Sequence, residues 1–256
     1  MSHHTLDITD LSYTYPDGTA ALSALSLHIG HGESVAIVGA NGSGKTTLLS
    51  HLNGVLLPTA GTVNIGGFPV TKQTLPQIRR TVGMVFQNPD DQLFMPTVYE
   101  DVAFGPVNMG LPSTDVKARV TAALTTVGAL ELSDRPPYRL SGGQKRAVAI
   151  ATVLAMEPAI LVMDEPTAAL DPWARRQLIE LLRTFTHTKI IATHDLDMAL
   201  DLCERTIVLA NGSILKDGPT AEVFRNLPLL AQAHLEQPFS LQNCPLCSKS
   251  MGNNTL

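Results

Sequence analysis

The amino-acid sequence predicts an α/β fold with a parallel-sheet core, an antiparallel β-subdomain at the N-terminus and an inserted helical subdomain. Short apolar runs of strand length recur along the chain, and segments with a helical pattern separate them. A glycine-rich loop at residues 39–46 lies directly between one such run and a helix. Residues 88–158 are mostly helical in pattern and interrupt the alternation. The 256 residues, 44% of them hydrophobic, suffice for one buried core with a small second lobe.

The N-terminal elements are predicted from alternation and turn residues. Residues 5–30 alternate apolar and polar side chains around Pro16-Asp17-Gly18, which is typical of a β-hairpin. The apolar, β-branched run 34–38 indicates a buried strand that leads into the glycine-rich loop. Residues 45–53 continue as a helix that ends near Gly54. Further strands are predicted at 61–65 and 81–86.

The elements of the second half follow from similar signals. Ser113 or Thr114 is expected to cap a helix that runs to Val127, with Asp115 in its first turn. Another helix begins at a Ser-Gly-Gly turn at 141–143 and stops before Pro158. The remaining predictions are a strand at 159–163, a helix at 173–185, a strand at 189–193, a helix at 195–203 and a hairpin over 205–215 that turns at Asn211-Gly212. We expect one domain over 1–235, with its helical subdomain at about 88–158, and a loosely ordered tail over 236–256.

Composition limits the classes of function. The formal net charge is −5, which argues against broad nucleic-acid binding because that requires a basic face. The sequence has no run of the roughly 18 apolar residues that a membrane-spanning helix needs, and no secretory signal. We therefore expect a cytosolic protein that other subunits can hold at a membrane. Cys203 is expected in the core, whereas Cys244 and Cys247 are expected to be reduced thiols, with a metal or redox site as the less favoured alternative.

Two turns carry the residue types that bind phosphate. The loop Gly39-Ala40-Asn41-Gly42-Ser43-Gly44-Lys45-Thr46 opens a helix, so its backbone N–H groups can cradle phosphates. Lys45 is expected to reach the β- and γ-phosphates of a nucleoside triphosphate, and the Thr46 hydroxyl to ligate Mg²⁺. The turn Ser141-Gly142-Gly143-Gln144 is a second helix N-terminus. One triphosphate rarely needs two cradles unless they belong to different subunits.

Further polar side chains follow predicted strands, and ligands bind at such strand ends in open α/β sheets. Asp164 and Glu165 follow the run 159–163. We expect Asp164 to orient Mg²⁺ and Glu165 to position and polarise an attacking water. Gln87 follows the strand at 81–86, and His194 follows the strand at 189–193. The alternatives are a salt-bridged acid pair, a surface glutamine and a structural histidine.

The chain contains the glycine-rich loop, the turn at 140–144 and the Asp164-Glu165 pair in this order. With these motifs it resembles the ATP-binding-cassette (ABC) ATPases over roughly residues 5–235. The resemblance implies the ABC nucleotide-binding domain, with a P-loop NTPase core of the RecA type. It also implies a dimer that sandwiches ATP between the P-loop of one subunit and the signature turn of the other. Tyr15 would stack on adenine, with Tyr13 as a near alternative.

The resemblance also assigns roles residue by residue. ATP binding is implied for Tyr15, Gly39, Asn41, Gly42, Ser43, Gly44, Lys45, Thr46, Thr47, Ser141, Gly142, Gly143, Gln144 and Asp171. Catalysis is implied for Glu165, for His194 as a γ-phosphate contact and for Gln87, and Mg²⁺ binding for Thr46, Gln87 and Asp164. Asp171 would cross the dimer interface.

Longer strings resemble one subgroup, the energy-coupling-factor (ECF) importers. These strings are residues 88–94, Asn-Pro-Asp-Asp-Gln-Leu-Phe, and residues 97–106. Residues 48–54 and 105–111 resemble the cobalt/nickel branch, which implies a homodimer, whereas the vitamin branch uses two different ATPases. Ala147 and the Ala168-Ala169 pair depart from the family pattern. The implied partners are a second copy, a membrane coupling subunit and a substrate-binding membrane subunit at the cytoplasmic face of the cell membrane, without nucleic acid.

The segment 87–104 would line the groove that receives helices of the coupling subunit. Its candidate apolar contacts are Phe94, Met95, Val98 and Phe104, which could equally be core of the helical subdomain. A soluble ABC ATPase acting on DNA or ribosomes is disfavoured, because the chain has one cassette and no coiled-coil heptads between its motifs. A structural subunit without turnover is disfavoured by the complete catalytic set. The transported solute is not encoded in this chain.

Overall fold

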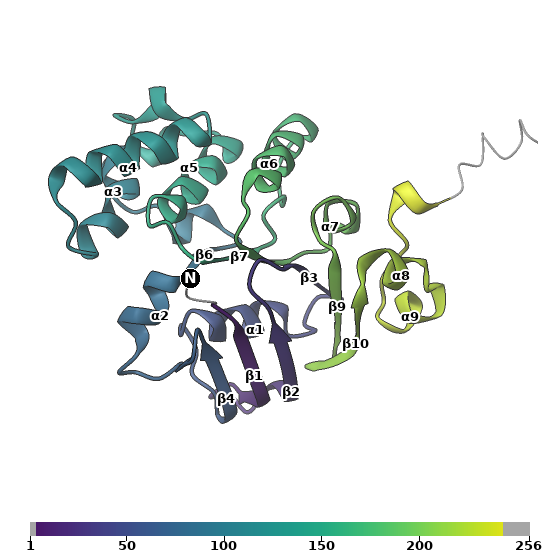
Figure 1. Ribbon diagram of the computed structural model, residues 1–256. Helices are drawn as coiled ribbons and strands as arrows, with labels where there is room; N and C mark the ends of the chain where they lie inside the picture. The colour runs from purple at the N-terminus through teal and green to yellow at the C-terminus, as the bar shows by residue number, and fades with distance from the viewer. Residues whose placement is uncertain (1–3, 243–256) are drawn as a thin grey trace, which may run out of the picture.

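The computed structural model describes residues 4–242 and shows the expected α/β architecture, with two sheets and a helical lobe (Figure 1). The larger sheet contains β3 (Ser34–Val38), β6 (Val82–Val85), β7 (Ile160–Asp164), β8 (Thr188–Ala192), β9 (Arg205–Ala210) and β10 (Ser213–Pro219), in the order β10-β9-β3-β8-β7-β6. The strands from β9 to β6 are parallel, and β10 pairs antiparallel with β9. The apolar runs that predicted these strands are buried on both faces, as a parallel sheet requires.

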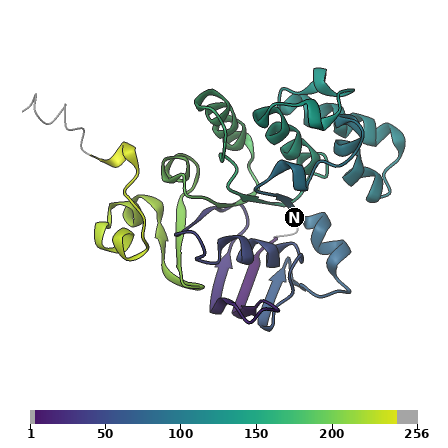
Figure 2. The same cartoon turned by 180° about the vertical axis from the view of Figure 1, so that it is seen from behind.

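The second sheet is antiparallel and contains the predicted N-terminal hairpin. It consists of β1 (Leu6–Thr14), β2 (Ala20–Ile29), β4 (Ala60–Ile65) and β5 (Phe68–Pro69), in the order β2-β1-β4-β5. Helix α1 (Lys45–Leu52) lies between the two sheets, as the view from behind also shows (Figure 2). Its leucines share one core with the inner faces of both sheets. The glycine-rich loop therefore joins β3 to a helix that is packed on both sides.

The helical lobe is a separate layer with its own core. It contains α3 (Val98–Asn108), α4 (Ser113–Thr126) and α5 (Gly142–Leu154), together with short 3₁₀ turns at Pro89–Asp91, Leu130–Leu132 and Pro137–Arg139. A capping box between Thr97 and Glu100 begins α3. The expected cap of α4 was wrong: Ser113 is already helical and Pro112 occupies the cap position. Pro112 has φ −58° and ψ 150°, so it lies outside the helix, and its side chain makes no capping hydrogen bond.

Five further helices, α2 and α6 to α9, lie outside the helical lobe among the described residues. The predicted helices at 173–185 and 195–203 are α6 (Pro172–Thr184) and α7 (Leu196–Leu202). The sequence did not predict α2 (Leu75–Thr81), α8 (Thr220–Arg225) and α9 (Leu227–Gln232), which are too short for a clear helical period. The hairpin β9–β10 turns at Asn211 and Gly212, both with positive φ, as a two-residue loop requires.

The start of the predicted loose tail is attached to the domain. The N–H groups of Phe239 and Ser240 donate to the two carboxylate oxygens of Asp197 in α7, at 3.1 and 3.0 Å. A 3₁₀ turn at Phe239–Leu241 follows. Cys203 is buried as expected, and burial raises the pKa of its thiol to about 12. Cys244 and Cys247 lie outside the described residues.

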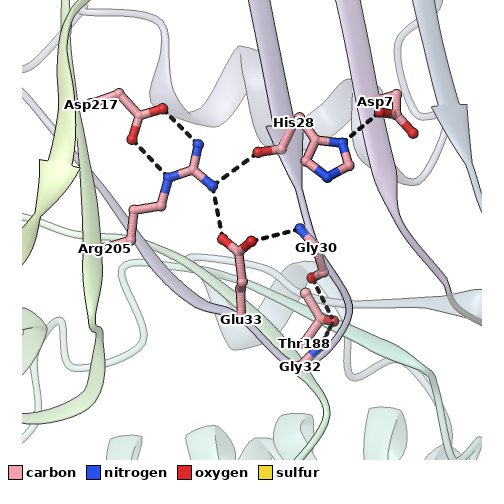
Figure 3. Close-up of polar contacts among 8 residues, drawn as sticks. All are labelled: Asp7, His28, Gly30, Gly32, Glu33, Thr188, Arg205 and Asp217. Carbon is pink, nitrogen blue, oxygen red and sulfur yellow. Dashed lines mark hydrogen bonds and ion pairs between the residues drawn. The ribbon is translucent and has the colours of Figure 1, made fainter.

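A polar network fastens the antiparallel sheet to the larger sheet (Figure 3). The Arg205 guanidinium of β9 binds the Asp217 carboxylate of β10 through two hydrogen bonds, at 2.6 and 2.7 Å. It also donates to Glu33 Oε2 at 2.8 Å and to the His28 carbonyl at the end of β2 at 3.0 Å. These carboxylate contacts raise the pKa of Arg205, so the arginine is charged at every pH at which the protein is folded. No helix within residues 4–242 is long and apolar enough to cross a membrane.

Candidate ATP-binding and hydrolysis site

The predicted site residues meet at one edge of the larger sheet. The glycine-rich loop follows β3, His194 follows β8, Asp164 ends β7 and Gln87 follows β6. These four strands are neighbours in the order β3-β8-β7-β6 and are parallel. Their carboxyl ends therefore lie side by side, which is where open α/β sheets bind ligands.

The glycine-rich loop is fixed by backbone contacts. A methyl group on Gly39 would overlap the carbonyl oxygen of Leu209 in β9. Gly44 has a φ of +105°, and a Cβ there would lie 2.8 Å from the Ala21 carbonyl oxygen in β2. The N–H of Gly212 donates to the Ser43 carbonyl at 3.1 Å. The backbone of the loop thus packs closely against β2, β9 and the β9–β10 turn.

Lys45 begins α1 and lies under the loop. Its ammonium group donates to the carbonyl oxygens of Gly39 at 2.8 Å and Ala40 at 3.2 Å. Burial lowers the pKa of Lys45, and the negative charges of Glu165 and Asp164 oppose this shift. No side chain among residues 4–242 caps α1, so its first N–H groups remain available to an anion. The loop therefore offers a buried cation and a bare helix end.

These residues line a pocket of about 290 Å³. Its walls are Tyr15, Thr19, Ala20, Ala21, Asn41, Gly42, Gly44, Lys45, Thr46, Thr47, Gln87, Asp164 and Glu165. The Tyr15 ring is partly exposed at the mouth of the pocket, and its hydroxyl lies 2.9 Å from Thr47 Oγ1. Tyr13 is buried and packs edge-on against Tyr15 and His51, so it belongs to the core. Of the two tyrosines, only Tyr15 presents a ring to a ligand.

The chemistry of the pocket fits Mg²⁺. Asp164 is 2% exposed, and its Oδ1 has no hydrogen-bond partner among the described residues. Burial raises the pKa of Asp164, whereas the Thr46 hydroxyl, Lys45 and Arg146 counteract this shift. Mg²⁺ is bound by one or two carboxylates together with phosphates and water, so Asp164, Thr46 and the Gln87 amide supply suitable oxygens.

Glu165 and His194 form a pair beside this pocket. Glu165 is 6% exposed and has a φ of +46°. Its Oε2 accepts the backbone N–H of His194 at 3.1 Å and lies 2.8 Å from His194 Nδ1. The imidazole itself is exposed, so its other edge can reach a ligand. A carboxylate and an imidazole in contact can position and deprotonate a water molecule.

The second predicted cradle lies elsewhere. Ser141 caps α5, and its side chain and that of Gln144 form a capping box, with contacts of 3.3 and 3.0 Å. Asp171 caps α6 by accepting the N–H groups of Trp173 and Ala174. Both caps line a second pocket, which shares no residue with the first. One chain therefore holds two half-sites that face different spaces.

Residues 22–168 match the protein family described as ABC transporter. The chain belongs to the ABC transporter family. This ABC ATPase is similar to curated relatives in sequence and to solved structures in fold. An ABC transporter ATP-binding protein of Geobacter sulfurreducens is 63% identical over 97% of this chain and 100% of its own length. The energy-coupling factor transporter ATP-binding protein EcfA1 of Methanospirillum hungatei is 48% identical over 92% of this chain and 86% of its own.

The structural neighbours are also ABC proteins. CbiO1 of Clostridium perfringens, described as part of the ABC transporter complex cbiONQ, is 39% identical, with a TM-score of 0.79 over 96% of this chain and 98% of its own. The ATP-binding cassette MJ0796, a dimer in a post-hydrolysis state with ADP and Pi, is 30% identical, with a TM-score of 0.76 over 84% of this chain and 98% of its own. Like them, this chain binds ATP, and it hydrolyses ATP as a member of the family.

The four residues expected to contact a coupling subunit differ in their exposure to solvent. Phe94 and Phe104 are exposed and pack edge-on with ring centroids 5.0 Å apart. Met95 is partly buried, whereas Val98 is fully buried in the core of the lobe, which confirms the core alternative for this residue. Val107, which the sequence analysis did not single out, is exposed on the same helix as Phe104.

Sequence analysis also missed Arg146. Its guanidinium is buried beneath the Gln87 segment, although arginine is usually exposed. The available signal was its position: residues 146, 149, 150 and 153 follow helical spacing and are among the buried residues of α5, which also include 148 and 151. A charged residue in an apolar face needs polar partners, which the sequence alone does not identify.

Proposed function

We propose that this chain is the ATP-hydrolysing subunit of an ECF-type importer that transports cobalt or nickel ions. The observation that carries the ATP-hydrolysing dimer in this proposal is the separation of the two cradles within one chain. A second copy placed head to tail would bring the signature turn of each subunit to the P-loop of the other. Two ATP molecules would then hold the dimer closed.

Each residue has a proposed role in the cycle. Lys45 and the N–H groups of the loop bind the phosphates, and Tyr15 stacks on adenine. Asp164, Thr46 and Gln87 would hold Mg²⁺, which neutralises phosphate charge when bound. Glu165 positions the attacking water and accepts its proton, and His194 contacts the γ-phosphate. Their hydrogen bond holds the two side chains in a fixed position relative to each other.

The opposing subunit completes the site. The N–H groups of Gly142 and Gly143 and the Ser141 hydroxyl would face the γ-phosphate, while Asp171 lies at the dimer interface. Because Ser141 and Gln144 are joined in a capping box, the turn is rigid before nucleotide arrives. Hydrolysis and phosphate release remove the bridge between the cradles, so the dimer opens.

Support for the importer class comes from the strings at 88–94 and 97–106 and from the likeness to EcfA1 and CbiO1. The cobalt/nickel branch rests on the strings at 48–54 and 105–111. The exposed pair Phe94 and Phe104 would contact the membrane coupling subunit and transmit the movement of the helical lobe. The protein would then lie on the cytoplasmic face of the cell membrane through its membrane subunits.

The test is to purify the chain from detergent-solubilised native membranes and to identify the proteins that accompany it. We expect one ATPase species with a coupling subunit and a metal-type substrate-binding subunit. A second, different ATPase with a vitamin-type subunit would overturn the branch but retain the importer. The absence of any membrane subunit would overturn the transport function and leave the ATPase alone.

A further inference from the structure

Arg146 connects two motifs of the same subunit. It is the fifth residue of α5, directly after the signature turn, and is 3% exposed. Its Nη1 donates to the Phe86 carbonyl at 2.7 Å, and its Nη2 donates to the Gln87 carbonyl at 2.5 Å. Its Nε has no partner among the described residues. The guanidinium thus serves mainly to hold the backbone at the start of the Gln87 segment.

Two further side chains fasten the same segment to α5. Gln92 Oε1 accepts the N–H of Phe86 at 3.1 Å, while Gln92 Nε2 donates to the Ala149 carbonyl at 2.8 Å and to Thr152 Oγ1 at 2.7 Å. Lys145 binds the Asp90 carboxylate at 2.5 Å. Residues 86–92 are therefore attached to α5 at both ends. Of the three side chains, only Arg146 is itself buried, and among the described residues it is the only side chain that bonds to Gln87.

We propose that Arg146 is a positioning residue for ATP hydrolysis, which locks residues 86–92 to α5 so that Gln87 and the signature turn move as one body. The inference rests on the proposed role of Gln87 at the Mg²⁺ and water position. A contact of Gln87 with nucleotide in its own site would shift the signature turn that faces the other site. The two ATP sites of a dimer are thereby coupled through one arginine in each subunit.

The chemistry suits a lock rather than a passive core contact. Two carbonyl oxygens and a charged, planar donor give directional hydrogen bonds, which are stronger than those between neutral groups. An arginine side chain is charged at any pH at which a protein is folded, so both contacts with the carbonyl oxygens are charge-assisted. The following residue is Ala147, so the positive charges of α5 that bind this segment are those of Lys145 and Arg146, and only Arg146 binds its backbone.

The first measurement uses the full-length protein without nucleotide. Arg146→Met keeps an unbranched side chain and removes all donors, Arg146→Lys retains one charged donor, and Arg139→Met removes the same charge from an exposed site on the same lobe. Amide hydrogen exchange of residues 86–92 should become about tenfold faster in Arg146→Met, partly recover in Arg146→Lys and stay unchanged in Arg139→Met. Exchange in α4 should not change. Equal acceleration in α4, or none at 86–92, would overturn the lock.

The second measurement separates kcat from KM. Arg146→Met should lower kcat roughly tenfold and change the KM for ATP by less than about twofold, because the P-loop is untouched. Arg146→Lys should restore part of kcat. A raised KM with normal kcat would show that Arg146 supports binding only, and would overturn the proposal.

A double variant tests whether Arg146 acts through Gln87. The double variant Gln87→Ala with Arg146→Met should have a kcat within about twofold of that of Gln87→Ala alone, because the side chain that Arg146 positions is then absent. Multiplied losses would overturn the link between the two residues. Normal turnover in Gln87→Ala alone would instead refute the proposed role of Gln87, while the exchange experiment would still decide whether the lock exists.

Discussion

Glu165, the proposed catalytic carboxylate, has a strained backbone conformation. Its φ of +46° is unusual for a residue with a side chain and costs on the order of 1–3 kcal/mol. The strain is held by β7 before it and by its N–H bond to the Ala192 carbonyl at 2.8 Å. The result is a buried carboxylate that points back across the strand ends toward His194.

Glu165→Gln should therefore bind ATP but hydrolyse it 10²- to 10³-fold more slowly, roughly the loss expected when a general base is removed. The amide keeps the shape of the side chain, so the ATP-bound dimer should accumulate. Turnover and light scattering with ATP measure both effects, with Glu222→Gln, at an exposed position of α8, as the control. Turnover near that of the control would remove Glu165 from the mechanism.

At the residue scale, sequence motifs predicted which side chains occupy the pocket but not how they are held. Lys45, Asp164 and Gln87 line it as expected, because motif residues at adjacent strand ends must converge. Arg146 was not predicted, since its partners are backbone carbonyls some 60 residues away, and these carry no sequence signature. The roles of the site residues remain predictions for the experiments proposed above.

Among the secondary-structure elements, α6 and α7 are joined by a partly buried ion pair next to His194. Arg175 of α6 binds both oxygens of Asp195, the cap of α7, at 2.6 and 2.8 Å, and the Thr167 hydroxyl donates at 3.1 Å. Burial alone would raise the pKa of Asp195, but these hydrogen bonds lower it below its usual value. The helix that follows Asp171 is thus linked to the segment that carries His194.

Asp195→Asn should lower the free energy of unfolding at pH 7 by roughly 1–3 kcal/mol, because it leaves Arg175 unpaired. The depressed pKa gives a stabilisation that is complete above the unfolded value of about 4 and is lost as the pH falls through the folded value. Urea unfolding at several pH values should show the two curves converging in acid. Asp134→Asn, at an exposed site, serves as the control. A constant gap down to low pH would contradict this assignment.

The Arg205 network gives a prediction for the junction of the two sheets. Arg205→Met should lower the free energy of unfolding by about 2–4 kcal/mol, because two carboxylates and a carbonyl lose their donor. The matched change Arg176→Met, whose ion pairs are exposed and 3.6–3.7 Å long, should cost less than about 1 kcal/mol. Denaturant unfolding of the two variants measures both losses. Equal losses in the free energy of unfolding would show that the Arg205 network stabilises the fold no more than an exposed ion pair does.

Whole elements were predictable where the pattern was long or the turn chemistry was specific. The N-terminal hairpin, the buried strands and α5 are examples, because alternation, continuous apolar runs and a capping signal each have one structural solution. The helices α8 and α9 span six residues each and depend on packing against the sheet, which a local pattern does not encode. The start of α4 was misplaced for a local reason, the proline at its cap.

For the whole molecule, two half-sites in one chain imply that defects can complement. Lys45→Ala should abolish ATP binding but leave the signature turn intact, whereas Gly143→Asp should block the turn with a negative charge and leave the P-loop intact. Each variant alone should be inactive. A one-to-one mixture should regain up to about a quarter of the wild-type activity, because half of the dimers then hold one complete site. An inactive mixture would contradict the head-to-tail sandwich, provided that mixed dimers are shown to form.

The backbone packing around the P-loop also bears on how such a protein can diverge. Where main chain meets main chain without side chains between, as Gly39 meets Leu209, substitution has almost nothing to vary. The exposed side chains of Phe94, Phe104 and Val107 on the helical lobe have no such constraint. After gene duplication, substitutions that change the proposed membrane partner should therefore accumulate on the helical lobe, while the P-loop stays unchanged. Engineering of partner specificity should likewise start from the exposed residues of the helical lobe.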